Sequence, residues 1–316
     1  MPYAELHTLS CYSFLRGASH PHELVERAAE LGYSAVAITD ECSLAGVVKA
    51  HVAAKRAGIK LIIGSELNLL EGLQLVALAP SRAAYSELSG LISLARRRSP
   101  KGEYQVALRD VIFHLKRCLL IWKPPGAGTT IMAGAKSTNS GMADAPSSTS
   151  DAINTCDTTE LGYGRQLARL CRGRIWLGVT HLLGNEELGR YYQLQALAQQ
   201  LDVPMAACGA VQMHVATRKP LHDVFTALHH NTSVAQLGRR RLANSQQHLR
   251  RPEQLEQLYP PSLLAATLDI AARCQFSLEE LRYEYPEEVV PPGQSAGSYL
   301  RQLVEEGCSA RWPAGV

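Results

Sequence analysis

The sequence lacks the features that would place this chain in a membrane or outside the cell. Its 316 residues contain no run of about 18 apolar residues, the length at which a helix can span a bilayer. The first residues, Met-Pro-Tyr-Ala-Glu, have neither the basic head nor the apolar core of a signal peptide. The eight cysteines stand singly, without a CxxC pair or a regular framework, so we expect reduced thiols. These absences predict a cytoplasmic protein with no membrane partner.

The sequence also has little net charge, and +3 at pH 7 is too small to identify a binding partner. Hydrophobic residues make up 46% and charged residues 19%, which is typical of an ordinary globular protein. A chain of this length fits one large α/β domain with an appendage, or two domains.

Short apolar strands alternate with helical segments over about the first 230 residues. Strands are expected at 3–7, 35–38 and 60–66, and a fourth at 73–78 follows the turn 70–72 without a crossover helix. Ser43 is expected to cap a helix that runs from Leu44 towards Gly58. This alternation favours a barrel or a parallel sheet.

Acidic and histidine side chains follow three of these strands. Glu5 and His7 end the first, Asp40 and Glu41 follow the second, and Glu66 ends the third. Because the carboxyl ends of parallel strands meet at one edge, these five residues are candidate metal ligands at a common rim.

Periodicity is interrupted within these first 230 residues and changes again after them. Residues 124–159 are rich in Gly, Ala, Ser and Thr, and we expect a flexible surface insertion there. From about residue 231 to residue 316 the pattern is mainly helical and polar, ending in a helix from Ser298 to Arg311. The predicted domains are therefore a barrel at 1–230 and a helical connector at 231–316.

Several motifs occur in an order that resembles one family. They include Tyr-Ala-Glu-Leu-His at 3–7, Ser-Phe-Leu-Arg-Gly-Ala-Ser-His-Pro at 13–21 and Ala-Ile-Thr-Asp-Glu-Cys-Ser-Leu-Ala-Gly at 37–46. Together they resemble the N-terminal PHP (polymerase and histidinol phosphatase) domain of bacterial C-family DNA polymerases. More narrowly, they resemble the error-prone, damage-induced paralogue of the replicative α subunit. The likeness extends over nearly the whole chain except the insertion.

This resemblance implies a PHP-type distorted (β/α)7 barrel, an α/β fold similar to a TIM barrel, followed by a mainly helical C-terminal extension. It also implies that the chain is the front part of a longer polymerase whose palm lies beyond Val316. We therefore expect the chain to have no polymerase activity alone. The implied partners, through the parent polymerase, are DNA, the sliding clamp and other mutagenesis proteins.

The resemblance also implies that the metal site is degenerate. Metal-competent PHP domains carry a His-x-His pair where this chain has Glu5 and His7, and Thr-Asp-His where Glu41 stands last. Their late Asp-x-His pair falls on Ala210 and Gln212, and neither alanine nor a neutral amide is a good ligand for a hydrolytic metal. The remaining residues could gather one hard cation, so we expect a weak or empty site for Zn²⁺, Mn²⁺ or Mg²⁺.

Two functions follow from this pattern. The first is a structural or partner-binding module of an error-prone polymerase that acts in damage-induced mutagenesis and translesion synthesis. The alternative is a metal-dependent phosphoesterase of the PHP superfamily. Arg96, Arg97 and Arg98 are candidate nucleic-acid contacts through phosphate, although arginines at a helix C-terminus are commonly solvated and matched to the helix dipole.

Overall fold

A computed structural model describes residues 2–124, 162–184, 187–281 and 290–313. These residues fall into two compact units, Met1–Glu280 and Leu281–Val316. The predicted insertion at 124–159 lies outside the described residues, apart from Pro124.

The first unit is built on one curled sheet of seven strands that follow one another in chain order. They are β1 (Ala4–Glu5), β2 (Ala35–Ile38), β3 (Lys60–Asn68), β4 (Gln74–Leu78), β5 (Leu119–Lys123), β6 (Ile175–Val179) and β7 (Met205–Ala207). All neighbours are parallel except β4, which is antiparallel to both β3 and β5. Just after β1 and β7, Thr8 and Val211 form a parallel bridge that brings the two edges together. The predicted distorted α/β barrel is confirmed.

The reversal at β4 comes from a hairpin that the sequence predicted at residues 70–72. The amide of Leu69 donates to the carbonyl of Leu73 at 2.8 Å, and Gly72 adopts a φ of 83° in the turn. A connection this short can join only antiparallel strands, because a parallel pair needs a long crossover. The carboxyl ends of β1, β2, β3, β5, β6 and β7 therefore share one rim.

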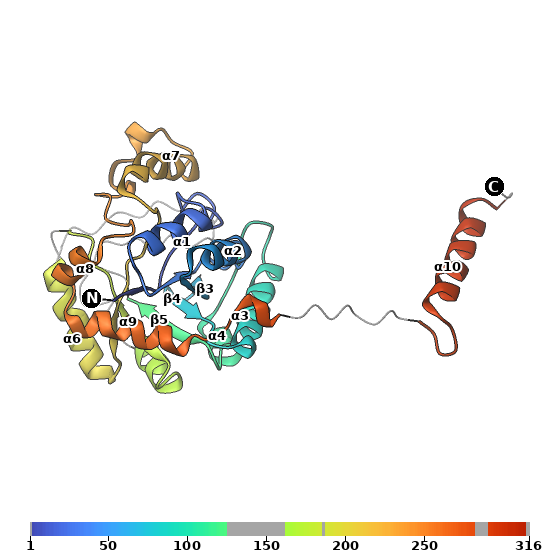
Figure 1. The fold of residues 1–316 in the computed structure, drawn as a ribbon, viewed down its shortest axis with the longest axis horizontal. Helices are drawn as coiled ribbons and strands as arrows, with labels where there is room; N and C mark the ends of the chain where they lie inside the picture. Colours follow the sequence, from blue (N-terminus) through green and yellow to red (C-terminus); the bar gives the residue numbers. More distant parts are fainter. Residues whose placement is uncertain (1, 125–161, 185–186, 282–289, 314–316) are drawn as a thin grey trace, which may run out of the picture. The chain divides into compact units, whose positions relative to one another are not determined.

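Helices lie outside these strands, as Figure 1 shows for α1, α2 and α3. The helices of the first unit are α1 (Pro21–Glu30), α2 (Val47–Ala57), α3 (Arg82–Arg97), α4 (Leu108–His114), α6 (Glu187–Leu201), α7 (Lys219–His229), α8 (Pro252–Leu258) and α9 (Pro261–Arg273), with residues 162–170 also helical. Short 3-10 turns occur at η1 (Ala216–Arg218), η2 (Val234–Gln236), η3 (Gly238–Arg240) and η4 (Leu278–Glu280).

The expected cap at Ser43 is wrong. Helix α2 begins only at Val47, and its N-cap, Gly46, makes no side-chain hydrogen bond. The backbone amide of Ser43 instead donates to Ser65 Oγ at 3.2 Å. The segment after β2 is thus held against β3 before the chain turns into the helix.

Helix α9 packs on the barrel. Its Ile270 and Ala271 share an apolar cluster with Ala4 and Ala35, the first residues of β1 and β2. The amide of Ala4 donates to Thr267 Oγ1 at 3.3 Å. The compact unit consequently extends to Glu280, beyond residue 230, where the sequence placed the end of the barrel domain. Apolar packing occupies the amino ends of the strands and leaves the polar residues at the opposite rim.

The second unit contains α10 (Ala296–Arg311), which agrees with the helix predicted from residue 298. Ser295 caps it, because its hydroxyl accepts from the amide of Ser298 at 3.2 Å. In the part of the chain that the structure describes, no helix combines the length and apolar character needed to cross a membrane.

Candidate site at the barrel rim

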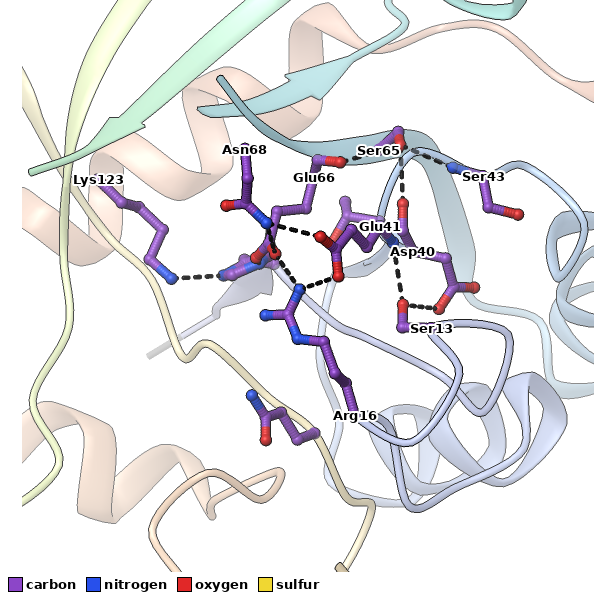
Figure 2. Close-up of polar contacts among 12 residues, drawn as sticks. Ser13, Arg16, Asp40, Glu41, Ser43, Ser65, Glu66, Asn68 and Lys123 are labelled. Carbon is purple, nitrogen blue, oxygen red and sulfur yellow. Dashed lines mark hydrogen bonds and ion pairs between the residues drawn. The ribbon is translucent and has the colours of Figure 1, made fainter. Parts of the chain in front are cut away.

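The rim carries a compact polar network in which an arginine lies between two glutamates (Figure 2). Glu66 projects from β3, and Glu41 lies three residues after the end of β2. An isolated parallel bridge pairs Glu41 with Glu66, so the two carboxylates come from neighbouring backbone positions. Arg16 reaches them from the loop between β1 and α1.

Arg16 contacts both carboxylates through one nitrogen. Its Nη1 donates to Glu66 Oε1 at 2.6 Å and also to Glu41 Oε2. The Glu66 side chain is fully buried, whereas that of Glu41 is 22% exposed. Burial alone would raise the pKa of Glu66, but the Arg16 charge and the His7 hydrogen bond hold that pKa well below its usual range. Glu66 is therefore a buried carboxylate anion.

His7 links Glu66 to a lysine. One ring nitrogen, Nε2, lies 2.7 Å from Glu66 Oε2, and the other, Nδ1, lies 3.2 Å from Lys123 Nζ. Because an ammonium group only donates, Nδ1 must accept and Nε2 must carry the proton that reaches Glu66. Burial, followed by the charge of Lys123, lowers the pKa of His7 to about 4. His7 is therefore neutral at pH 7 and cannot add positive charge to the site.

Two further side chains complete the surroundings of Glu41. Its Oε1 accepts from the Tyr104 hydroxyl and from Asn68 Nδ2, each at 2.8 Å. Together with Arg16, they provide hydrogen-bond partners for both oxygens of this carboxylate. Burial, followed by the charge of Glu41, raises the pKa of Tyr104, so its hydroxyl remains a donor.

Asp40 turns away from Glu41 and ties down the loop that carries Arg16. Its Oδ1 accepts from the amide of Ser10 and the hydroxyl of Ser13, and its Oδ2 accepts from the hydroxyl of Ser10, all at 2.7 Å. Burial raises the pKa of Asp40, against the opposing effect of these hydrogen bonds. Among the described residues, the Asp40 carboxylate is bound by Ser10 and Ser13 and by none of the other candidate ligands, so Asp40 positions the loop.

Glu5 is engaged in a separate set of contacts. Its carboxylate accepts from the hydroxyl of Tyr3 and from the amides of His7 and Gly209, each at 3.0 Å. The side chain is fully buried, and that burial raises its pKa. The first and last strands of the barrel are therefore joined through this carboxylate.

Of the five predicted ligands, the structure brings together His7, Glu41 and Glu66, and connects Glu5 and Asp40 to other groups. Among the described residues, no three His, Cys, Asp or Glu side chains are grouped as metal ligands. The positions of the late Asp-x-His pair add no metal ligand. Ala210 has only a methyl group, and Gln212 Oε1 lies 2.6 Å from His222 Nε2. The multi-metal centre of metal-competent PHP domains does not fit these residues. Binding of a single weak ion stays a prediction.

The sequence interpretation missed four members of the network: Arg16, Asn68, Tyr104 and Lys123. A signal was present for two of them. Asn68 lies two residues after Glu66 in one strand and so shares its face. Lys123 ends β5, whose carboxyl end belongs to the same rim. No local pattern marks Tyr104 or Arg16, because each reaches the site from a connecting segment.

The three arginines predicted as a cluster at the end of α3 make different contacts. Arg96 donates to the carbonyls of Glu41 and Cys42 at 3.1–3.2 Å and lies over the Tyr104 ring. Arg98 pairs with Asp110 at 2.7 Å, and Arg97 is exposed. Contact of this cluster with nucleic acid stays a prediction. Arg96 has a clear internal role, since it secures the segment that carries Glu41.

The chain is similar to a protein family, to curated sequences and to solved structures. Residues 5–120 match the family described as PHP domain. The chain is 48% identical over 316 residues to the error-prone DNA polymerase of Teredinibacter turnerae, covering 100% of this chain and 28% of that protein. The corresponding enzyme of Saccharophagus degradans is 45% identical, with coverage of 100% and 28%. A solved amidohydrolase from Chromobacterium violaceum, with bound sulfate and no metal, aligns with a TM-score of 0.45 and 14% identity, covering 67% of this chain and 88% of that one.

Proposed function

This chain belongs to the error-prone DNA polymerases and contains their PHP domain, and from this membership we propose that it is a structural and partner-binding module without phosphoesterase activity. The chain spans about 28% of the length of the curated relatives it matches. The activity of the whole polymerase is therefore proposed here and not observed in this chain. We propose that the parent polymerase, of which this chain would be one part, is a cytoplasmic nucleotidyltransferase that copies damaged templates during DNA repair and mutagenesis. Its partners would be DNA, the sliding clamp and other mutagenesis proteins.

One observation supports the non-catalytic role. The oxygens of Glu41 and Glu66 and both nitrogens of His7 already have protein partners within the rim. A metal-dependent hydrolase needs ligand groups that face a metal and an open coordination position for water or substrate. A rim whose polar groups bind one another is suited to holding the barrel in one shape, on which other domains or proteins can dock.

The phosphoesterase alternative is tested with the purified chain and bis(p-nitrophenyl) phosphate, with Mn²⁺, Zn²⁺ or Mg²⁺ added in turn. We expect no release of p-nitrophenol above the protein-free rate. His7→Gln is the matched control, because contaminating phosphatase would be unaffected by it. Metal-dependent hydrolysis by the unmodified chain that disappears in His7→Gln would contradict the proposal.

Template-directed nucleotide addition is tested by primer extension on undamaged and damaged templates. We expect no extension, because the polymerase reaction uses carboxylates that hold two metal ions, and among the described residues no three His, Cys, Asp or Glu side chains are grouped to hold a metal. Clear incorporation by the purified chain would place polymerase catalysis within these 316 residues and would refute this assignment.

A further inference from the structure

We propose that Arg16 is a built-in cation that takes the place of a metal ion at this rim and locks the β1–α1 loop onto β2 and β3. The resemblance to metal-competent PHP domains leads one to expect an ion among these carboxylates, and the structure has a guanidinium there instead. The inference rests on the geometry of the rim and does not depend on the proposed function.

The contact geometry carries this inference. A single nitrogen, Nη1 of Arg16, contacts one oxygen of Glu41 and one oxygen of Glu66. One centre of positive charge shared by two carboxylates from adjacent strands is also the arrangement of a bridging divalent ion. The Arg16 side chain is 28% exposed and that of Glu66 is fully buried, so the guanidinium covers the inner carboxylate.

Charge balance gives the physical reason. Arg16 Nη1 contacts both Glu41 and Glu66, and two carboxylates held this close repel each other unless a cation compensates. Burial of one of them strengthens this repulsion, because the interior screens charge poorly. Arg16 supplies the compensating charge, and Lys123 donates to the far side of His7.

The loop is folded so that Arg16 faces inward. Ser13 donates to Asp40 at 2.7 Å, and the amide of Cys11 donates to the carbonyl of Ser19 at 2.8 Å, which fixes both ends of the loop. Gly17 lies so close to the chain that an added Cβ would be 2.0 Å from the carbonyl oxygen of Ser10. Such a prefolded loop delivers the guanidinium without a large ordering cost at the moment of contact.

The test is thermal melting of the 316-residue chain with EDTA, with MnCl2 and with MgCl2. Arg16→Met removes the cation and keeps a long side chain, and Arg97→Met is the matched control at an exposed arginine. In EDTA we expect Arg16→Met to melt at least about 5 °C lower, because one partner of a buried pair is lost. Arg97→Met should stay within about 1 °C of the unmodified chain.

The metal arms separate a structural arginine from a substitute for a metal. Excess Mn²⁺ should raise the melting temperature of Arg16→Met by about 3 °C or more and leave the unmodified chain unchanged. An equal Mn²⁺ shift in both proteins would overturn the proposal, because the site would then accept metal beside Arg16. The proposal would also be overturned if Arg16→Met had the same melting temperature as Arg97→Met, or if neither ion raised the melting temperature of Arg16→Met.

A double variant keeps the proposal testable if Arg16→Met does not fold. Adding Glu41→Gln removes one of the opposed charges, so Arg16→Met with Glu41→Gln should be recovered folded and melt above the single variant. It should also lose the Mn²⁺ response. Failure of the double variant to fold would refute the proposal, since relief of the charge repulsion would then not be what the site requires.

Discussion

Replacing His7 by glutamine should flatten the dependence of stability on acidic pH. His7 is 1% exposed, and burial together with Lys123 lowers its pKa from about 6.5 to about 4. The unfolded chain therefore takes up a proton at His7 below about pH 6.5, while the folded chain does not until about pH 4. The stability contributed by neutral His7 is fully present above pH 6.5 and is lost as the pH falls towards 4.

The magnitude follows from the two pKa values. A difference of about 2.5 units corresponds to about 3 kcal/mol of unfolding free energy, at about 1.4 kcal/mol per pH unit for one proton. Glutamine suits this test because its amide nitrogen can donate to Glu66 and its oxygen can accept from Lys123 without titrating. His222, whose pKa burial lowers to about 4, adds a similar loss in both proteins and cancels in the comparison.

The assay is urea unfolding of the unmodified chain and of His7→Gln at about pH 7.5, 6 and 5. Between the two lower values, the unmodified chain should lose about 1 kcal/mol more than the variant. His229→Gln, at an exposed histidine of α7, controls for the substitution itself. Parallel curves for the unmodified chain and His7→Gln would show that His7 titrates in the folded chain as it does in the unfolded chain, and would contradict the lowered pKa of His7.

Two packing predictions can be checked by the same unfolding measurement. Gly209→Ala places a Cβ 2.1 Å from the buried carboxylate of Glu5 and should lower the unfolding free energy by about 1–3 kcal/mol. The control Gly90→Ala, in helix α3 with nothing within 4 Å of the added Cβ, should raise it by about 0.5–1 kcal/mol. Equal effects of the two substitutions would contradict the close approach of Gly209 to Glu5. Arg96→Met should lower the unfolding free energy by about 1–3 kcal/mol, because it leaves the backbone carbonyls of Glu41 and Cys42 without this donor. The control Arg97→Met should change it by less than about 0.5 kcal/mol. An Arg96→Met variant as stable as the unmodified chain would contradict the structural role of Arg96.

Local signals in the sequence predicted the strands and turns of a barrel or a parallel sheet, and the family resemblance implied the distorted barrel. The apolar run at 35–38 and the turn at 70–72 each depend on a few consecutive residues, and both are present in the structure. The same signals predicted that His7, Glu41 and Glu66 share a rim, since parallel strands place their carboxyl ends together. The Ser43 cap was wrong because the Ser43 hydroxyl accepts from the amide of Ala45 in a turn, and helix α2 begins only at Val47.

The partners of those carboxylates were decided by tertiary structure. Tyr104 and Glu41 are 63 positions apart, and Lys123 and His7 are 116 apart, so no local pattern could pair them. Arg16 reaches the rim only because Asp40 and the serines fold its loop inward. The sequence by itself placed five candidate side chains at the ends of three strands, because each strand end is marked by local residues, but the structure brings only His7, Glu41 and Glu66 together. Only the tertiary structure decided that a guanidinium lies between Glu41 and Glu66, because charge compensation depends on which distant side chains the fold brings within reach.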